Sequence, residues 1–235
     1  MNFNGRRYIK FGSKIIDYEL VFADRKTLGI TVNPDSKIVV KAPRNSPIEK
    51  IEEKIRKKAY WIVKQQNNFL SYQPKFPQRK FIGGETHLYL GRQYRLQIII
   101  DRRNSVKILG GLIEVRAFNK ILVKNLVRNW YHFNAKKKFK EFADPLINKF
   151  LKYNIAPTNI EIRQMPTRWG SCTPKGKIIL NPELIKAPKG CIEYVIIHEL
   201  CHLVHRNHTK KFIELQTREM PDWQKWKMKL EHLMI

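Results

Sequence analysis

The first 70 residues alternate between apolar and polar side chains and then change to a helical period. Alternation at every second residue is typical of strands with one buried face. Four segments show it: residues 6–11, 15–22, 28–32 and 37–42. Asn-Pro-Asp at residues 33–35 predicts a turn between the last two strands, and we expect a meander. Ser46, Pro47 and Glu49 then begin a helix with a capping box, whose apolar stripe runs to about Phe69.

The middle of the chain repeats this change from strands to a helix. Pro74 and Pro77 mark residues 71–80 as a linker. Glycine pairs at residues 83–84 and 110–111 then separate further alternating segments. These segments are residues 87–91, 94–100, 105–109 and 112–118. We expect them to form a second small sheet.

A long basic helix is predicted from Lys120 to about Tyr153, with Pro145 expected to kink or divide it. Its polar face carries Lys120, Lys124, Arg128, Lys136, Lys137, Lys138 and Lys140. Such a face is either solvated or in contact with phosphates, and the pattern leaves both interpretations open. No helix-turn-helix, zinc-finger or RNP signature accompanies it, so nothing indicates sequence-specific readout of nucleic acid.

The whole chain is strongly basic. Its 235 residues include 46 Lys and Arg against 20 Asp and Glu, which gives a net charge of +26. This excess predicts attraction to polyanions, with DNA or RNA as the first choice. A generally basic, lysine-rich proteome would produce the same composition, and that alternative stays open.

The cysteines and the N-terminus indicate the compartment. Cys172, Cys191 and Cys201 lack C-x-x-C spacing, which favours reduced thiols. Residues 1–20 mix charge throughout, and no run of about 18 apolar residues occurs. We therefore expect a cytoplasmic protein that does not span a membrane.

The candidate chemistry lies in the pattern H-E-x-x-H formed by His198, Glu199 and His202. Four residues advance a helix by about 400°, so both imidazoles lie on one face about 6 Å apart and can bind one ion. Glu199 lies roughly 100° around the helix, where its carboxylate can accept a proton from a metal-bound water. Residues 194–197, Tyr-Val-Ile-Ile, predict that this helix is buried. The alternative is two histidines that are merely packed or solvated.

A catalytic zinc needs a third protein ligand. His205 lies about 10 Å of helix rise from His198, too far for one ion to bind both on a straight helix. Asn207 favours the left-handed conformation that ends a helix, which would bring His208 back toward the metal. We choose His208 as the third ligand. Two carboxylates remain as alternatives: Glu214 and Glu219.

The residues of this region resemble a known family. The segment HELCHLVHRNHTKKF at residues 198–212, with RWGSC at 168–172 and KIILNPELIKAP at 177–188, is similar to the YgjP-like metallopeptidases, bacterial zincins related to the SprT and WLM groups. The likeness covers nearly the whole chain, since ITVNPDSKIVVKAP at residues 30–43 and the following helix also resemble that family. It implies that His198, His202 and His208 are zinc ligands and that Glu199 is the catalytic glutamate, but it leaves the substrate undefined.

Residues 168–172 are the candidate substrate-binding segment. Predicted strands at residues 159–164 and 177–180 bracket them, and zincin helices commonly lie under a sheet whose edge strand binds an extended peptide. Arg168 would hold a carbonyl, carboxylate or phosphate, or stabilise an oxyanion, with a simple ion pair as the alternative. Trp169 and Ser171 complete the candidate set, although packing is the commoner role for Trp169 and a turn hydrogen bond for Ser171.

We therefore predict an α+β fold with a β-rich N-terminal region and one helix at residues 1–119, followed by a zincin-like module at residues 120–235. The expected activity is zinc-dependent hydrolysis of peptide bonds near nucleic acid, with water activated by Glu199. Two alternatives are a zinc-dependent hydrolase of nucleotide phosphoanhydrides and a nucleic-acid-binding protein with a structural metal. The partner is then a protein or peptide substrate, whose identity, like the oligomeric state, the sequence does not define.

Overall fold

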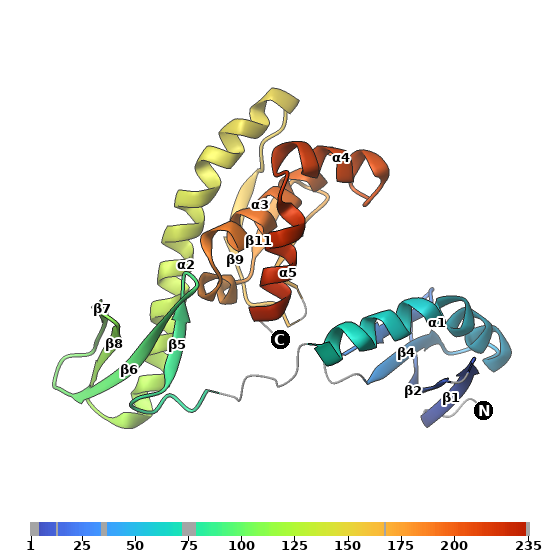
Figure 1. The fold of residues 1–235 in the computed structure, drawn as a ribbon, viewed down its shortest axis with the longest axis horizontal. Helices are drawn as coiled ribbons and strands as arrows, with labels where there is room; N and C mark the ends of the chain where they lie inside the picture. The colour runs from blue at the N-terminus through green and yellow to red at the C-terminus, as the bar shows by residue number, and fades with distance from the viewer. Residues whose placement is uncertain (1–4, 13, 34–36, 72–78, 167, 234–235) are drawn as a thin grey trace. The chain divides into compact units, whose positions relative to one another are not determined.

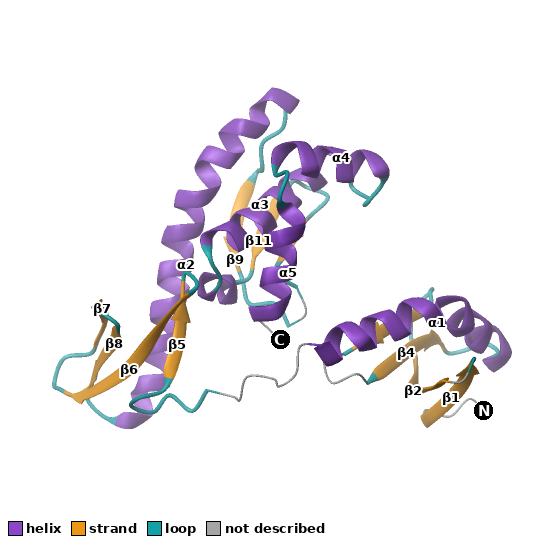
Figure 2. Ribbon diagram, in the orientation of Figure 1, coloured by secondary structure: helices purple, strands orange, loops and turns teal. Residues whose placement is uncertain are grey.

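The computed structural model describes residues 5–12, 14–33, 37–71, 79–166 and 168–233. The chain divides into two compact units, unit 1 at Met1–Pro77 with Ile235 and unit 2 at Gln78–Met234. Both mix helices and strands, as the predicted α+β class requires (Figure 2). No helix among the described residues is both long enough and apolar enough to cross a membrane.

Unit 1 is a four-stranded sheet covered on one face by a helix (Figure 1). The elements are β1 (Gly5–Phe11), β2 (Lys14–Ala23), β3 (Gly29–Val32), β4 (Ile38–Pro43) and α1 (Ile48–Ser71). The strand order is β1-β2-β4-β3, so the expected meander is wrong: β4 pairs in parallel with β2 and lies between β2 and β3. The inward residues of β4 are fully buried, which suits a strand with neighbours on both sides.

The first part of unit 2 repeats this topology. The strands are β5 (Thr86–Tyr89), β6 (Arg92–Ile100), β7 (Ser105–Leu109) and β8 (Leu112–Ala117). Their order is β5-β6-β8-β7, again with a parallel pair in the centre. A helix follows, as α1 follows β4 in unit 1. The central parallel pair of each sheet joins strands that are not neighbours in sequence. Alternation alone therefore identified the strands of both sheets but not their order.

Helix α2 (Lys120–Phe150), followed by η1 (Leu151–Tyr153), connects this sheet with the rest of unit 2. The Asn119 side chain caps it by accepting a hydrogen bond from the Leu122 N–H at 3.2 Å. Pro145 lies inside the helix and does not divide it. A proline costs one backbone hydrogen bond and about 3 kcal/mol, and buried residues on both sides of it, Phe142 and Phe150, hold the helix against the core.

The C-terminal part of unit 2 is a small sheet with three helices. Its elements are β9 (Asn159–Ile162), β10 (Gly170–Cys172), β11 (Lys177–Leu180), η2 (Pro182–Lys186), α3 (Lys189–Val204), α4 (Lys210–Glu219) and α5 (Trp223–Leu233). The strand order is β10-β11-β9, so β10 is an edge strand, and α3 packs beside it. A Cβ at Gly190 would lie 2.5 Å from the Trp226 ring, so glycine lets α3 and α5 approach closely.

The boundary between the two units differs from the division expected at residues 119 and 120. Leu96 of β6 and Val115 of β8 belong to the same hydrophobic core as Val127 of α2 and Ile196 of α3. The second sheet therefore joins the C-terminal elements rather than the N-terminal sheet. The division falls between Pro77 and Gln78, and residues 72–78 of the predicted linker lie outside the described residues.

Candidate active site

Helix α3 carries the H-E-x-x-H pattern as a buried element. The residues before His198 are apolar and buried, as are Leu200 and Cys201 after Glu199. The helix ends at Val204, and His205 has extended backbone (φ −130°, ψ 106°). Helix α3 thus stops before Asn207, which is not among the described non-glycine residues with positive φ. The chain does turn back, but by extended backbone at His205 rather than by the expected left-handed asparagine.

The turn brings His208 to the two histidines of α3. One ligand atom from each of His198, His202 and His208 lies within 4.8 Å of the other two. Among the described residues, this is the only group of three or more potential metal ligands that come so close together. The Nε2 atoms of His198 and His208 are 3.1 Å apart. Two nitrogens bound tetrahedrally to zinc at about 2.0–2.1 Å lie roughly 3.3 Å apart. The spacing of this pair therefore fits two ligands of one ion.

The outer nitrogens of the α3 histidines have oxygen partners. Nδ1 of His198 lies 2.8 Å from Oε1 of Gln216, and Nδ1 of His202 lies 3.2 Å from the backbone oxygen of His205. Because both partners are assigned as acceptors, each Nδ1 carries the proton and each Nε2 keeps its lone pair. Burial lowers the pKa of His198 to about 4, despite the opposing hydrogen bond to Gln216. Neutral imidazoles with inward-facing lone pairs are the ligands that zinc requires.

Gln216 is a functional residue that the sequence did not reveal. It lies on α4, is 1% exposed, and contacts His198 across a separation of 18 residues. Partners of this kind fix the tautomer and orientation of a metal-binding imidazole. Nothing in the spacing of α4 distinguishes this glutamine from a surface residue, because its role depends on how α4 packs against α3.

Glu199 is buried beside the histidines. It is 5% exposed, and its carboxylate accepts a hydrogen bond from the backbone N–H of Cys172 in β10. Burial raises the pKa of Glu199 to about 7, although Arg168 and the Cys172 N–H both favour the charged form. A Cβ at Gly170 would lie 2.7 Å from Oε1 of Glu199, so only glycine allows β10 to come this close to the carboxylate.

A pocket of about 600 Å³ opens over the histidines and Glu199. Arg168 and Ser171 line it, together with Cys172 and Arg206, whereas Trp169 is not among the lining residues and packs against the core. The pocket is therefore bounded on one side by the edge strand β10 and on the other by α3 and the turn after it. Of the predicted substrate-binding residues, two reach the space where a substrate would bind.

Neither alternative third ligand joins the histidine group. Glu214 is exposed and pairs with Lys210 at 3.8 Å. Glu219 is buried, and its carboxylate binds the Tyr153 hydroxyl and the ammonium groups of Lys149 at 3.1 Å and Lys152 at 2.9 Å. These partners keep the pKa of Glu219 low in spite of burial, and they occupy the carboxylate.

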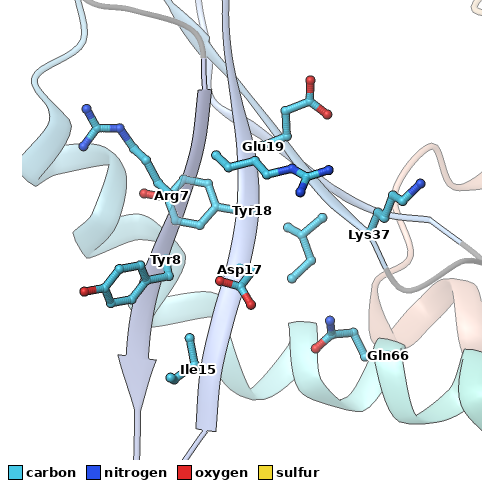
Figure 3. Close-up of a pocket in the computed structure, with 10 residues that line it drawn as sticks. Arg7, Tyr8, Ile15, Asp17, Tyr18, Glu19, Lys37 and Gln66 are labelled. Atoms are coloured by element: carbon cyan, nitrogen blue, oxygen red, sulfur yellow. The ribbon is translucent and has the colours of Figure 1, made fainter.

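Unit 1 has a hollow of its own, of about 710 Å³, beside strands β1 and β2 (Figure 3). Cationic side chains, Arg7 and Lys37, share it with the anionic Asp17 and Glu19. Among the described residues around it, no three potential metal ligands converge. The hydrolytic chemistry therefore belongs to unit 2.

An H-E-x-x-H helix with a buried glutamate, next to an edge strand, is the arrangement of metallopeptidases. The family described as YgjP-like, metallopeptidase domain, matches residues 26–233, and the chain belongs to it. The chain is thus a metallopeptidase, an enzyme that acts on protein or peptide substrates with a catalytic metal, and the resemblance found in the sequence is confirmed.

A comparison with solved structures finds further similarity. The crystal structure of the metallopeptidase zymogen of Methanocaldococcus jannaschii jannalysin is similar, with 22% identity, a TM-score of 0.37, and coverage of 41% of this chain and 97% of that chain. A search of the curated proteins finds no match.

Proposed function

We propose that the protein is a zinc-dependent peptidase in which His198, His202 and His208 hold the ion and Glu199 is the general base. The convergence of three imidazole nitrogens within 4.8 Å, next to a buried glutamate, carries this proposal. A bound zinc would polarise the scissile carbonyl and make water more acidic. Three imidazoles suit zinc better than magnesium, which prefers oxygen ligands.

Glu199 moves the protons in this proposal. A carboxylate with a pKa near 7 takes a proton from the attacking water and gives it up again easily at neutral pH. The proton then passes to the nitrogen of the leaving amine. The Cys172 N–H holds one side of the carboxylate, so that Glu199 keeps a fixed orientation during both transfers.

Strand β10 supports a peptide rather than a small molecule as the substrate. Among the described strands it pairs with β11 alone, and its residues line the pocket with Glu199. An extended peptide that adds to this edge would place a backbone carbonyl near the histidines. Arg168, exposed at the pocket rim, is positioned to bind a carbonyl or carboxylate of that peptide.

The test combines metal analysis with proteolysis of a denatured, fluorescently labelled protein. Glu199→Gln should retain zinc and lose about 10²–10⁴-fold in turnover, since it removes proton transfer and leaves the imidazoles in place. Glu193→Gln is the matched control, because Glu193 lies on the same helix and pairs with Lys189 at 3.4 Å. Full activity of Glu199→Gln, or loss of its zinc, would contradict the assignment.

A second candidate is hydrolysis of nucleotide phosphoanhydrides. Two guanidinium groups, those of Arg168 and Arg206, line the same pocket and would suit a phosphate chain. The same preparation is offered nucleoside triphosphates in the absence of protein. Release of phosphate that depends on Glu199, with no cleavage of the denatured protein, would favour this candidate.

Association with nucleic acid is supported by α2. Exposed cations follow four of its buried residues by one position, at Lys124, Arg128, Lys136 and Lys140, and His132 takes the place between the second and the third. Two of the cations on this helix have acidic partners, since Lys138 pairs with Glu141 at 2.8 Å and Lys140 pairs with Asp144 at 3.4 Å. Affinity for mixed-sequence DNA should fall linearly with salt on logarithmic axes, and Lys124→Glu with Lys136→Glu should flatten that slope. Absence of binding at low salt would remove nucleic acid from the proposal and leave the peptidase unaffected.

A further inference from the structure

Unit 1 has a groove that the proposed peptidase chemistry does not use. It lies between α1 and the edge strand β3, has a volume of about 400 Å³, and is lined by Leu28, Ile30, Lys54, Lys57, Lys58 and Trp61. The four residues from α1 are spaced at helical intervals of three and four, so they form one continuous face. The groove thus has an apolar floor and a basic wall.

We propose that this groove binds an extended acidic segment of a polypeptide, which adds to the sheet of unit 1 as a strand next to β3. Three features of the groove define that occupant: a free strand edge, an apolar floor, and cations available for pairing. The proposal does not depend on the metal site, because all of its residues belong to unit 1.

The free edge follows from the register of β3. The Asn33 N–H donates to the Lys37 oxygen at 2.8 Å, and β3 pairs antiparallel with β4, with Thr31 opposite Val39 and Gly29 opposite Lys41. In an antiparallel pair, hydrogen-bonded positions alternate. The N–H and C=O groups of Ile30 and Val32 therefore point away from β4. No strand of the described residues lies beyond β3 in this sheet, so these groups are available to an added strand.

The floor and wall select the side chains of the occupant. Trp61 is a large aromatic residue that is 42% exposed, and Leu28 and Ile30, which pack against the core of unit 1, are only partly buried. Trp61 and the lysines all belong to α1, so one face of an added strand would meet both the apolar floor and the basic wall, and that face would carry apolar and acidic residues in turn. Neither Lys54 nor Lys58 forms an ion pair with any described residue, whereas Lys57 pairs with Glu53 at 2.6 Å.

An acidic peptide fits the groove better than a single-stranded nucleic acid. Nucleic-acid strands are held by several aromatic platforms that stack successive bases, and this groove has one aromatic residue among aliphatic ones. A free strand edge binds the peptide backbone and offers nothing specific to a sugar-phosphate chain. Nucleic acid is accordingly the competing outcome of the test.

The experiment measures binding to the full-length chain carrying Glu199→Gln, so that the probe is not cut and a failure of the peptidase proposal does not affect the result. The probe is a short fluorescein-labelled peptide with threonine at every second position and valine and glutamate in turn at the positions between, so that one strand face carries both. Fluorescence anisotropy reports its binding. Lys54→Glu with Lys58→Glu should weaken it about tenfold or more, because two attractive contacts become repulsive. Lys107→Glu with Lys225→Glu makes the same change in net charge at exposed positions of unit 2 and should leave the affinity unchanged.

A second probe tests the strand edge without altering the protein. The same peptide, methylated on alternate backbone nitrogens, loses the N–H donors needed to pair with β3 and should not bind. Absence of binding by the unmodified acidic peptide would overturn the proposal, as would binding that methylation does not weaken. Tighter binding of oligothymidylate with the same sensitivity to the Lys54 and Lys58 substitutions would assign the groove to nucleic acid instead.

Discussion

The hydrogen bond between Gln216 and His198 should control how tightly the protein holds its metal. Gln216→Leu keeps the volume of this buried side chain and removes the acceptor that lies 2.8 Å from Nδ1 of His198. The imidazole then loses the partner that keeps its proton on Nδ1, and the tautomer with a protonated Nε2 cannot bind the ion. Loss of such a partner lowers metal affinity by about 10–100-fold, or roughly 1.4–2.7 kcal/mol.

The same substitution has a second consequence that separates orientation from general damage. A buried N–H without an acceptor costs about 1–3 kcal/mol, so the metal-free variant should also unfold at a lower urea concentration. Gln216→Glu retains an acceptor and should retain zinc. Thr217→Val is the control on the same helix, because it removes the 3.0 Å hydrogen bond from Trp223 Nε1 at an exposed position and does not contact the histidines.

The assay is competition for zinc with a chromophoric chelator at neutral pH, together with urea unfolding of the metal-free protein. We expect Gln216→Leu to release zinc to the chelator at concentrations that leave the wild type and Thr217→Val loaded. If Gln216→Leu holds zinc within about twofold of the wild type, the hydrogen bond does not orient His198 and the reasoning is wrong.

Three further predictions follow from particular contacts. Purified protein should contain close to one zinc per chain, and His202→Ala should lose most of it in elemental analysis, since one of three imidazoles is gone; full retention would refute the ligand set. Gly170→Ala should lower peptidase turnover while zinc stays bound, because the new Cβ would meet Glu199 Oε1 at 2.7 Å and displace the carboxylate. Unchanged turnover would show that strand β10 moves away from Glu199 to make room for the methyl group. Burial lowers the pKa of His87, although Glu85 lies 2.9 Å away. Just below the unfolded pKa of about 6.5, the native state therefore binds fewer protons than the unfolded state. The free energy of unfolding should accordingly fall as the pH drops below that value. His87→Gln should make this decrease smaller in urea unfolding measured against pH, with the part due to His198 remaining. An identical pH profile would contradict the assignment.

Local patterns were sufficient for much of this protein. The strands and helices of both sheets lie where alternation and helical spacing predicted them, because those periods depend on residues only two to four positions apart. The same argument found His198, Glu199 and His202, since the geometry of a single helix determines which of its side chains share a face. A likeness to the YgjP-like family could also be read from these segments, and the match over residues 26–233 confirms it.

Only the tertiary structure decided the features that depend on distant partners. Strand β4 lies between β2 and β3, and the second sheet joins the core of α2 and α3, because pairing and packing depend on which buried faces meet. His208 reaches the other histidines by a turn that the sequence placed at the wrong residue. Gln216 and Gly170 have no signature in their own segments. Gln216 acts through a hydrogen bond to a residue 18 positions away, and Gly170 acts because it has no side chain. Both roles exist only where two elements pack together.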